Sequence, residues 1–149
     1  MARWTPLLGA DELNAVLASA FAGADGFDRV KEVAPGRVRV VQPFHPGMLR
    51  PGGLISGPTL MSLADTVAYV LVMAHVGPEL MAVTSSLTMN FLRGAKPGEI
   101  QAEGELLSLG RRNAVCDVRI WTEAPDRLAA QATVTYARAM PPPAESSVS

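Results

Sequence analysis

The sequence predicts an α+β domain in which an antiparallel β-sheet wraps around one long central helix. Residues 56–76 form a nearly continuous apolar segment that lacks the polar face of a surface helix. Four segments in which apolar and polar residues alternate follow it between residues 83 and 136, joined by short turns. Strands that are segregated after a helix favour an antiparallel sheet with that helix packed on one face.

Size, charge and cysteine content narrow the classes of protein further. The chain has 149 residues, of which 48% are hydrophobic, and its 13 Lys and Arg nearly balance its 14 Asp and Glu. This balance argues against a nucleic-acid-binding protein. Cys116 is the only cysteine, so we expect a small buried hydrophobe in a strand rather than a disulfide. The first residues do not read as a secretory signal, and we expect a cytoplasmic protein.

The elements before the long helix follow from periodicity and turn residues. Residues 11–23 predict an amphipathic helix with Asp11 as its N-cap and Gly23 at its end. Two extended segments, 27–33 and 37–44, flank a Pro-Gly turn. We therefore expect an N-terminal helical segment over residues 1–26, one domain over 27–139, and a disordered Pro- and Ser-rich tail over 140–149.

The long helix and the four later strands have clear boundaries. Ser56-Gly57-Pro58 is typical of a helix start, and Gly77-Pro78 of a helix end. In the first strand that follows, simple alternation places Val83, Leu87, Met89 and Phe91 on one face and Thr84, Ser86, Thr88 and Asn90 on the other. The remaining strands are predicted over residues 100–109, 114–120 and 128–136, with a bulge at Gly104 in the first of them.

Asp65 is the unexpected residue of the long helix, because no Lys or Arg lies between Arg50 and Arg93 to pair with it. Burial of a lone carboxylate costs several kcal/mol, and a membrane-spanning helix would carry it at an unfavourable depth. Three interpretations remain open. The acid lies on a narrow solvent-exposed strip of the helix, or it bonds a nearby polar side chain (Ser62, Thr66 or Tyr69) as a structural link, or it performs chemistry.

The start of the same helix adds a second chemical feature. The free N–H groups near Ser56 and Gly57 and the positive end of the helix dipole attract negative charge, and Gly57 allows a ligand close to the backbone. Such a place can stabilise a developing oxyanion. Asp65 follows Gly57 by about two helical turns, which is too far for one reacting centre. A dimer with antiparallel central helices would bring the helix start of one chain to Asp65 of the other.

Two stretches carry a resemblance to hotdog-fold thioesterases, and among them to PaaI-like acyl-CoA thioesterases: GGLISGPTLMSLADTVAYV and VTSSLTMNFLRGAKPGEIQAEGELLSLGRRNAVCDVRIW. The resemblance covers roughly residues 27–138. It implies the hotdog fold and hydrolysis of the thioester of a small or medium acyl- or aryl-acyl-CoA. It also implies a homodimer with a shared active site, or a homotetramer built from two dimers, and no cofactor apart from the coenzyme A of the substrate.

The resemblance assigns roles to particular residues. Gly57 matches the glycine whose N–H polarises the thioester carbonyl, Asp65 the acid that acts as general base or nucleophile, and Thr84 a hydroxyl residue that positions water. Ser56 stands where the family usually has His, and Pro58 where it has a further Gly. Ser56 could replace that His in part through its hydroxyl, and its presence motivates an alternative, a non-catalytic acyl-CoA-binding hotdog protein. A hotdog hydratase ranks below both because its His-containing signature is not apparent.

Further polar residues are candidates for substrate binding. Arg93, Arg111 and Arg112 end a strand or occupy a hairpin, where cations could hold the phosphates of coenzyme A, although charges at turns are also common on ordinary surfaces. Asn90 shares the predicted face of Thr84 and could line the pocket, or form a plain cross-strand hydrogen bond. His45 and His75 have no partner at metal-ligand spacing, so we predict no metal site.

Overall fold

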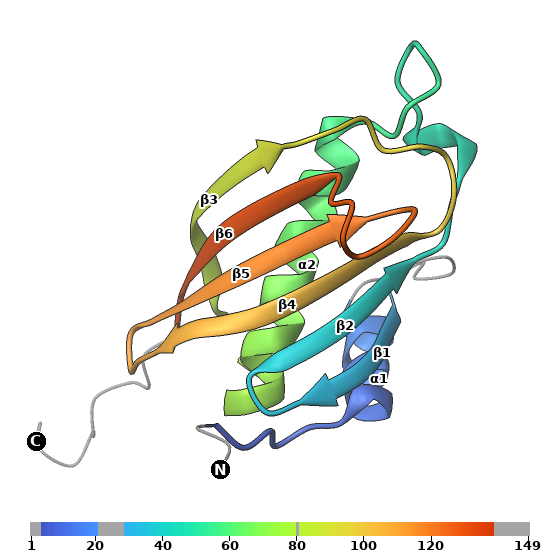
Figure 1. Cartoon of the computed structure of the whole chain (residues 1–149). Coiled ribbons are helices and arrows are strands. Elements are labelled where there is room, and N and C mark those ends of the chain that lie inside the picture. Colours follow the sequence, from blue (N-terminus) through green and yellow to red (C-terminus); the bar gives the residue numbers. More distant parts are fainter. Residues whose placement is uncertain (1–3, 21–28, 80, 139–149) are drawn as a thin grey trace, which may run out of the picture.

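The computed structural model describes residues 4–20, 29–79 and 81–138. Its elements are α1 (Ala10–Ala20), β1 (Arg29–Ala34), β2 (Arg37–Gln42), a 3-10 turn η1 (Pro46–Met48), α2 (Gly57–Val76), β3 (Val83–Phe91), β4 (Ile100–Leu109), β5 (Asn113–Trp121) and β6 (Ala130–Ala137). The six strands form one sheet in the order β1-β2-β4-β5-β6-β3, and every neighbouring pair is antiparallel. α2 runs behind this sheet, which curves around it (Figure 1). The predicted architecture is confirmed.

Helix α2 is the centre of the hydrophobic core. Its buried residues face the inner side of the sheet, where alternate residues of β4, β5 and β6 are also buried. By length and composition α2 could span a membrane, but most of its apolar segment is buried inside the fold. An apolar helix surrounded in this way is the core helix of the domain.

Both ends of α2 are closed by specific contacts. Ser56 is the N-cap, and its Oγ accepts a hydrogen bond from the Thr59 N–H. At the other end, Nε2 of the buried His75 accepts a 2.8 Å hydrogen bond from the Gly36 N–H, so its Nδ1 carries the proton that reaches the Leu71 carbonyl at 2.9 Å. The turn between β1 and β2 is thereby fixed to the last turn of the helix.

Helix α1 belongs to the same core as the sheet. Leu13 and Leu17 are buried in it, and the Asn14 side-chain amide bonds both the N–H and the carbonyl of Val30 at 2.8 and 2.9 Å. The helix begins at Ala10, so the predicted N-cap at Asp11 is wrong by two residues, and the carboxylate of Glu12 accepts a hydrogen bond from the Gly9 N–H at the helix start. The predicted helix end at Gly23, the start of the extended segment at residue 27 and the tail 140–149 lie outside the described residues.

Gly104 provides close packing rather than the predicted bulge. Its pairing with Val38 and Val118 is regular, and the irregularity between β4 and β5 falls later, between Leu106 and Ser108. A Cβ on Gly104 would lie 2.7 Å from Cγ1 of Val67 on α2, closer than such carbon atoms approach. The glycine is therefore needed because α2 lies directly on the middle of β4.

We predict that Gly104→Ala destabilises the fold by about 1–3 kcal/mol, because the added methyl group would collide with Val67 and crowd Leu71. Chemical denaturation followed by circular dichroism measures this loss. Gly110→Ala is the matched control, since a Cβ there would approach nothing closer than the Asn113 carbonyl oxygen at 3.5 Å. Equal stability of the two variants would contradict the packing role of Gly104.

Candidate functional site

Asp65 lies on the only side of α2 that the sheet leaves partly open within the described residues. Met61, Ser62, Asp65, Thr66 and Tyr69 follow one another at helical spacing and are exposed or half-buried, whereas their neighbours on the helix are buried. Asp65 on this strip is hydrogen-bonded to the edge strand β3 and to its neighbour β6. The expectation that Asp65 could sit on a narrow exposed strip is confirmed.

Two hydroxyl groups converge on one oxygen of the Asp65 carboxylate. The Thr84 hydroxyl on β3 donates a hydrogen bond to Oδ1. The Tyr136 hydroxyl on β6 lies 3.1 Å from the same Oδ1 and 3.3 Å from the Asp65 carbonyl oxygen. The carboxylate is therefore anchored to the sheet. These two partners lie across the core on two strands, whereas the sequence had directed attention to neighbours on the helix itself.

A β-bulge is what turns Thr84 toward Asp65. The register of β3 against β6 shifts between Thr84 and Ser86, so Thr84 pairs with Tyr136 while Leu87 pairs with Val134. Thr84 thus shares the inner face with Leu87 and Met89, and Val83 moves to the outer face. A bulge reverses the alternation of a strand at one position.

The prediction that Asn90 shares the face of Thr84 is wrong for the same reason, while its role in substrate binding stays a prediction. Asn90 pairs with Gln131 on the outer face, and its side-chain Nδ2 donates a 2.9 Å hydrogen bond to Oε1 of Gln131. Simple alternation had placed Asn90 on the face of Thr84, but the bulge separates them. The plain cross-strand hydrogen bond, which the sequence left open, is the interaction observed.

Sequence reasoning missed Tyr136 as a member of this group. The alternation of the last predicted strand places it on the inward-facing side, and it is 4% exposed. Burial, and then the nearby Asp65 charge, raise the pKa of Tyr136 well above the ordinary value of 10.0, and the adjacent Thr84 hydroxyl offsets part of this rise. Its phenol therefore keeps its proton at neutral pH. A tyrosine at a core position needs a hydrogen-bond partner, and that requirement was the available signal.

The start of α2 forms a second group of candidate residues. A cleft of about 380 Å³ lies here, lined mainly by apolar residues with two arginines at its margin: Arg50, Leu54, Ile55, Gly57, Leu60, Phe91, Leu92, Arg93, Gly94 and Ala95. Gly57 is the first residue of the helix, where the backbone N–H groups have no helical carbonyl partner. A Cβ on Gly57 would touch the Phe91 ring at 3.3 Å, so glycine keeps the space beside the ring open. Ser56 stands next to it as the N-cap.

Within one chain the two groups are separate. Asp65 follows Gly57 by eight residues along the helix, which corresponds to roughly 12 Å along the axis. Asp65 does not line the cleft, and neither Thr84 nor Tyr136 does. A carbonyl group held at Gly57 therefore could not reach the carboxylate of the same chain.

The predicted cationic residues lie at opposite ends of the sheet. The Arg112 carbonyl accepts a hydrogen bond from the Arg138 N–H, just after the last residue of β6. The Arg93 N–H donates to the carbonyl of Ala129, just before the first residue of β6. The seven steps of β6 separate these ends by roughly 23 Å. Arg93 lines the cleft, while Arg111 and Arg112 are exposed on the hairpin between β4 and β5. One chain thus cannot bring Arg93 and the hairpin arginines to the same phosphate.

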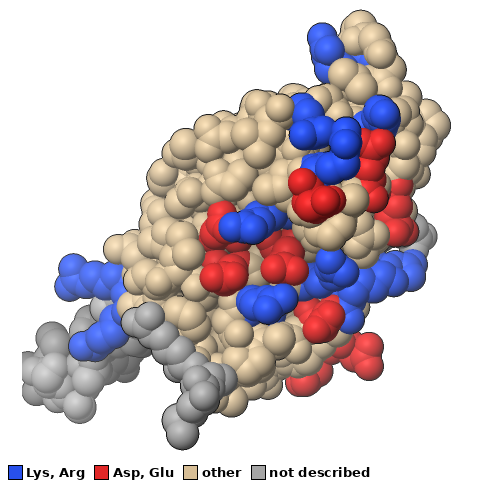
Figure 2. Space-filling model, viewed as in Figure 1, with Lys and Arg blue, Asp and Glu red and all other residues tan. Residues whose placement is uncertain are grey.

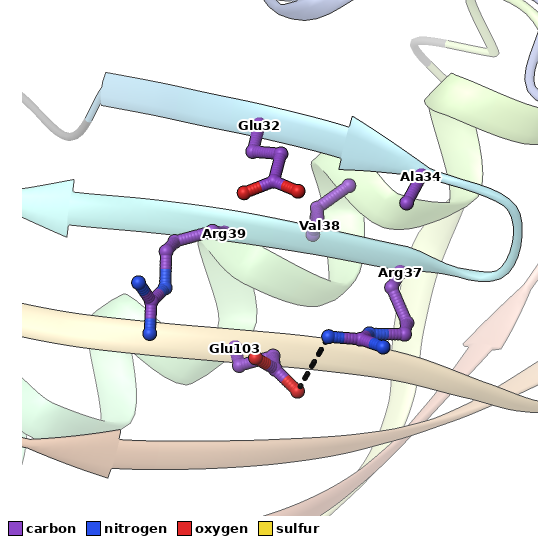
Figure 3. Close-up of a pocket in the computed structure, with 6 residues that line it drawn as sticks. All are labelled: Glu32, Ala34, Arg37, Val38, Arg39 and Glu103. Atoms are coloured by element: carbon purple, nitrogen blue, oxygen red, sulfur yellow. Dashed lines mark ion pairs between the residues drawn. The ribbon is translucent and has the colours of Figure 1, made fainter. Parts of the chain in front are cut away.

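A smaller hollow of about 180 Å³ lies on the outer face of the sheet, over β1, β2 and β4 (Figure 3). Its two acids and two bases balance, and Arg37 pairs with Glu103 at 3.5 Å. Glu32, Arg39, Glu103 and Arg119 face one another in turn across four strands. Figure 2 shows acidic and basic side chains mixed over this face of the molecule. These charges form cross-strand pairs on the far side of the sheet from Asp65.

Two further kinds of site find no support among the described residues. No group of three or more His, Cys, Asp or Glu side chains there could hold a metal ion. Cys116 is buried, as predicted, and burial raises the pKa of its thiol to about 12. A thiol with so little thiolate at neutral pH is a poor nucleophile. Asp65 is therefore the chemically prominent side chain of the inner face.

Comparison with known proteins identifies the family to which the chain belongs. The sequence profile of the thioesterase superfamily matches residues 52–129, more than half of the chain. A search of curated protein sequences finds no significant match. Among solved structures, a candidate thioesterase from Silicibacter sp. TM1040 is 34% identical, with 93% of this chain and 95% of that chain covered and a TM-score of 0.83.

Two more distant structures share the fold. A thioesterase from Haemophilus influenzae is 18% identical over 92% of this chain and 94% of that chain, with a TM-score of 0.76. The PaaI protein of the Escherichia coli phenylacetic acid degradation operon is 22% identical over 87% of this chain and 93% of that chain, with a TM-score of 0.74. At these identities the likeness shows the hotdog fold, in agreement with the sequence prediction.

We predict that Cys116 does not react with a thiol reagent in the native protein, because it is buried and its pKa is raised to about 12. Titration with a chromogenic disulfide at pH 8 should detect no free thiol until denaturant is added, and one per chain afterwards. Rapid reaction of the native protein would show that the strand around Cys116 opens readily.

Proposed function

The chain belongs to the thioesterase superfamily and is a thioester hydrolase, and from this premise we propose that its substrate is an acyl-CoA with a small or medium acyl or aryl-acyl group. The observation that carries the proposal is the anchored, half-exposed carboxylate of Asp65 on an apolar inner face. The apolar lining of the cleft at Gly57 suits an acyl or pantetheine segment, and its two arginines suit phosphate.

The proposed reaction uses Asp65 and the N–H of Gly57. Asp65 takes a proton from a water molecule, whose oxygen attacks the thioester carbonyl carbon. The Gly57 N–H and the positive end of the α2 dipole stabilise the oxyanion that forms. The C–S bond then breaks, and the proton on Asp65 returns to the sulfur, giving a carboxylic acid and free coenzyme A. In the alternative route Asp65 attacks directly, and water then hydrolyses the mixed anhydride.

We also propose that the active site is shared between two chains. The roughly 12 Å between Gly57 and Asp65 prevents both from acting on one carbonyl within a chain. β3 is an edge strand whose inner face is incompletely covered: Leu87 and Met89 are half-buried, and Phe91 is 55% exposed. Antiparallel contact between two such edges about a two-fold axis would set the start of β3 in one chain against its end in the other. It would also bring the hairpin with Arg111 and Arg112 toward the cleft of the other chain.

Four further properties belong to the proposed function. They are a homodimer or a dimer of dimers, a cytoplasmic location, no cofactor beyond the coenzyme A of the substrate, and a water-positioning role for Thr84. Thr84 uses its one hydroxyl proton on Asp65, so it could meet the attacking water only as an acceptor.

The Ser56 hydroxyl is occupied within its own helix start. It accepts a hydrogen bond from the Thr59 N–H and lies 2.8 Å from the Thr59 hydroxyl.

We predict that Asp65→Asn lowers the hydrolysis of acyl-CoA by about 10² to 10⁴-fold, because an amide cannot take up the proton. The amide oxygen can still accept from Thr84 and Tyr136, so the fold should persist. A panel of acyl-CoA substrates with a thiol-detecting dye measures turnover. Asp117→Asn, which changes a carboxylate on the outer face near Gln131, is the control and should stay fully active.

The same assay separates the proposal from the alternative function. Unchanged turnover in Asp65→Asn would remove Asp65 from the mechanism. Tight binding of acyl-CoA by the unmodified protein, with no thiol released over hours, would instead support a non-catalytic acyl-CoA-binding protein, which the replacement of the family His by Ser56 motivates.

We predict that two inactive variants restore activity when combined. Gly57→Val fills the space beside Phe91, and Asp65→Asn removes the base. Each mixed dimer would contain one intact site and one doubly altered site, so the purified mixed dimer should recover about half of the unmodified activity if the dimer has two-fold symmetry. The two chains are co-expressed with different affinity tags and purified through both. No recovery, or a monomer by light scattering, would overturn the shared site.

A further inference from the structure

We propose that Tyr136 is a positioning residue for Asp65: together with Thr84 it holds the Oδ1 oxygen, so that Oδ2 is the oxygen that reacts. The inference rests on the proposed function, because it assigns tasks to the atoms of the same carboxylate. It differs from the family resemblance, which gave no role to any residue of β6.

The first step is the rigidity of the tyrosine. Tyr136 lies on β6, between β5 and β3, and is 4% exposed. Its ring packs against the ring of Tyr69 on α2, with 6.1 Å between the ring centres. Because the backbone is fixed by strands on both sides and the ring by the core, the hydroxyl has little freedom to move. It can therefore serve as a fixed reference point for a mobile carboxylate.

The second step is the direction of the hydrogen bond. A phenol has one proton to donate, and this one stays protonated because burial and the Asp65 charge both raise the pKa of Tyr136. The proton is shared between Oδ1 at 3.1 Å and the Asp65 carbonyl oxygen at 3.3 Å. By contacting both the side chain and the backbone of Asp65, the hydroxyl fixes where the carboxylate stands on the helix.

The third step is the convergence of two donors on one oxygen. Thr84 and Tyr136 are directly paired across β3 and β6, an arrangement that exists only because of the bulge after Thr84. Both hydroxyls donate to Oδ1, and neither engages Oδ2. Hydrogen bonds stabilise the charge on the oxygen that accepts them and so make it less basic. Oδ2 is left as the more basic oxygen, at which a water proton would arrive or from which direct attack would occur.

The variant Tyr136→Phe removes one hydroxyl and keeps the ring. We expect kcat to fall roughly 10- to 100-fold with KM nearly unchanged, as for a misoriented catalytic group. A merely structural tyrosine would lower the melting temperature and leave kcat as it was.

Two further variants sharpen the test. Thr84→Val should act through the same oxygen, so the double variant with Tyr136→Phe should lose less than the product of the single losses. Thr88→Val removes a hydroxyl from the outer face of the same strand, opposite Thr133, and should leave turnover unchanged. Multiplicative losses in the double variant would overturn the claim that both hydroxyls act on Oδ1.

A readout that needs no turnover keeps the inference separate from the proposed function. Aspartate carboxyl carbons are labelled with ¹³C, and the Asp65 signal is assigned by its loss in Asp65→Asn. In Tyr136→Phe the chemical shift of this signal at a fixed neutral pH should change, because Oδ1 loses a hydrogen-bond donor, whether or not the protein hydrolyses any acyl-CoA. An unchanged signal would overturn the inference. An active protein with an inactive Asp65→Asn variant and a fully active Tyr136→Phe variant would overturn it too, while leaving the proposed function intact.

Discussion

The structure depends on the close packing of α2 against the concave face of the sheet. The helix lies so near β4 that Gly104 has no room for a side chain, and it is held at its C-terminal end by the hydrogen bond between His75 and the β1–β2 turn. This packing fixes the position of the helix along its axis and its rotation about that axis. It therefore also fixes where Asp65 meets the sheet and where Gly57 exposes its backbone.

The same packing leaves one opening, along the edge strand β3. A sheet that covers the helix from β2 to β6 cannot also close over the strip from Met61 to Tyr69, so the polar residues of α2 gather there. The bulge in β3 supplies Thr84 to this opening, and β6 supplies Tyr136. An edge strand with a partly uncovered apolar face is also a natural surface for a second chain. The chemistry and the proposed dimer thus arise from one feature of the fold.

Much of this could be read from the sequence, because periodicity and end signals act locally. Ser56, Pro58 and Gly77 marked the ends of α2, and alternation marked β4, β5 and β6 within a few residues. The errors share another cause: they depend on contacts between distant segments. Alternation alone cannot reveal the bulge that moves Asn90 away from Thr84, and Gly104 resembles a bulge residue until the helix above it is placed. Tyr136 resembles any core residue until its hydroxyl is seen at Asp65.

The structural and the chemical interpretations of Asp65 are compatible. The carboxylate lies on a half-exposed strip and is linked to the sheet, so a single chain can fold without the full cost of a buried charge. In the proposed dimer, the partner and the acyl-CoA would cover that strip and withdraw water from the acid. The exclusion of water would strengthen the electrostatic interactions among the carboxylate, the attacking water and the substrate. The free-energy cost of desolvating the Asp65 carboxylate would then be met during assembly and substrate binding, where the loss of water raises reactivity. If the same cost were met during folding, it would only reduce stability.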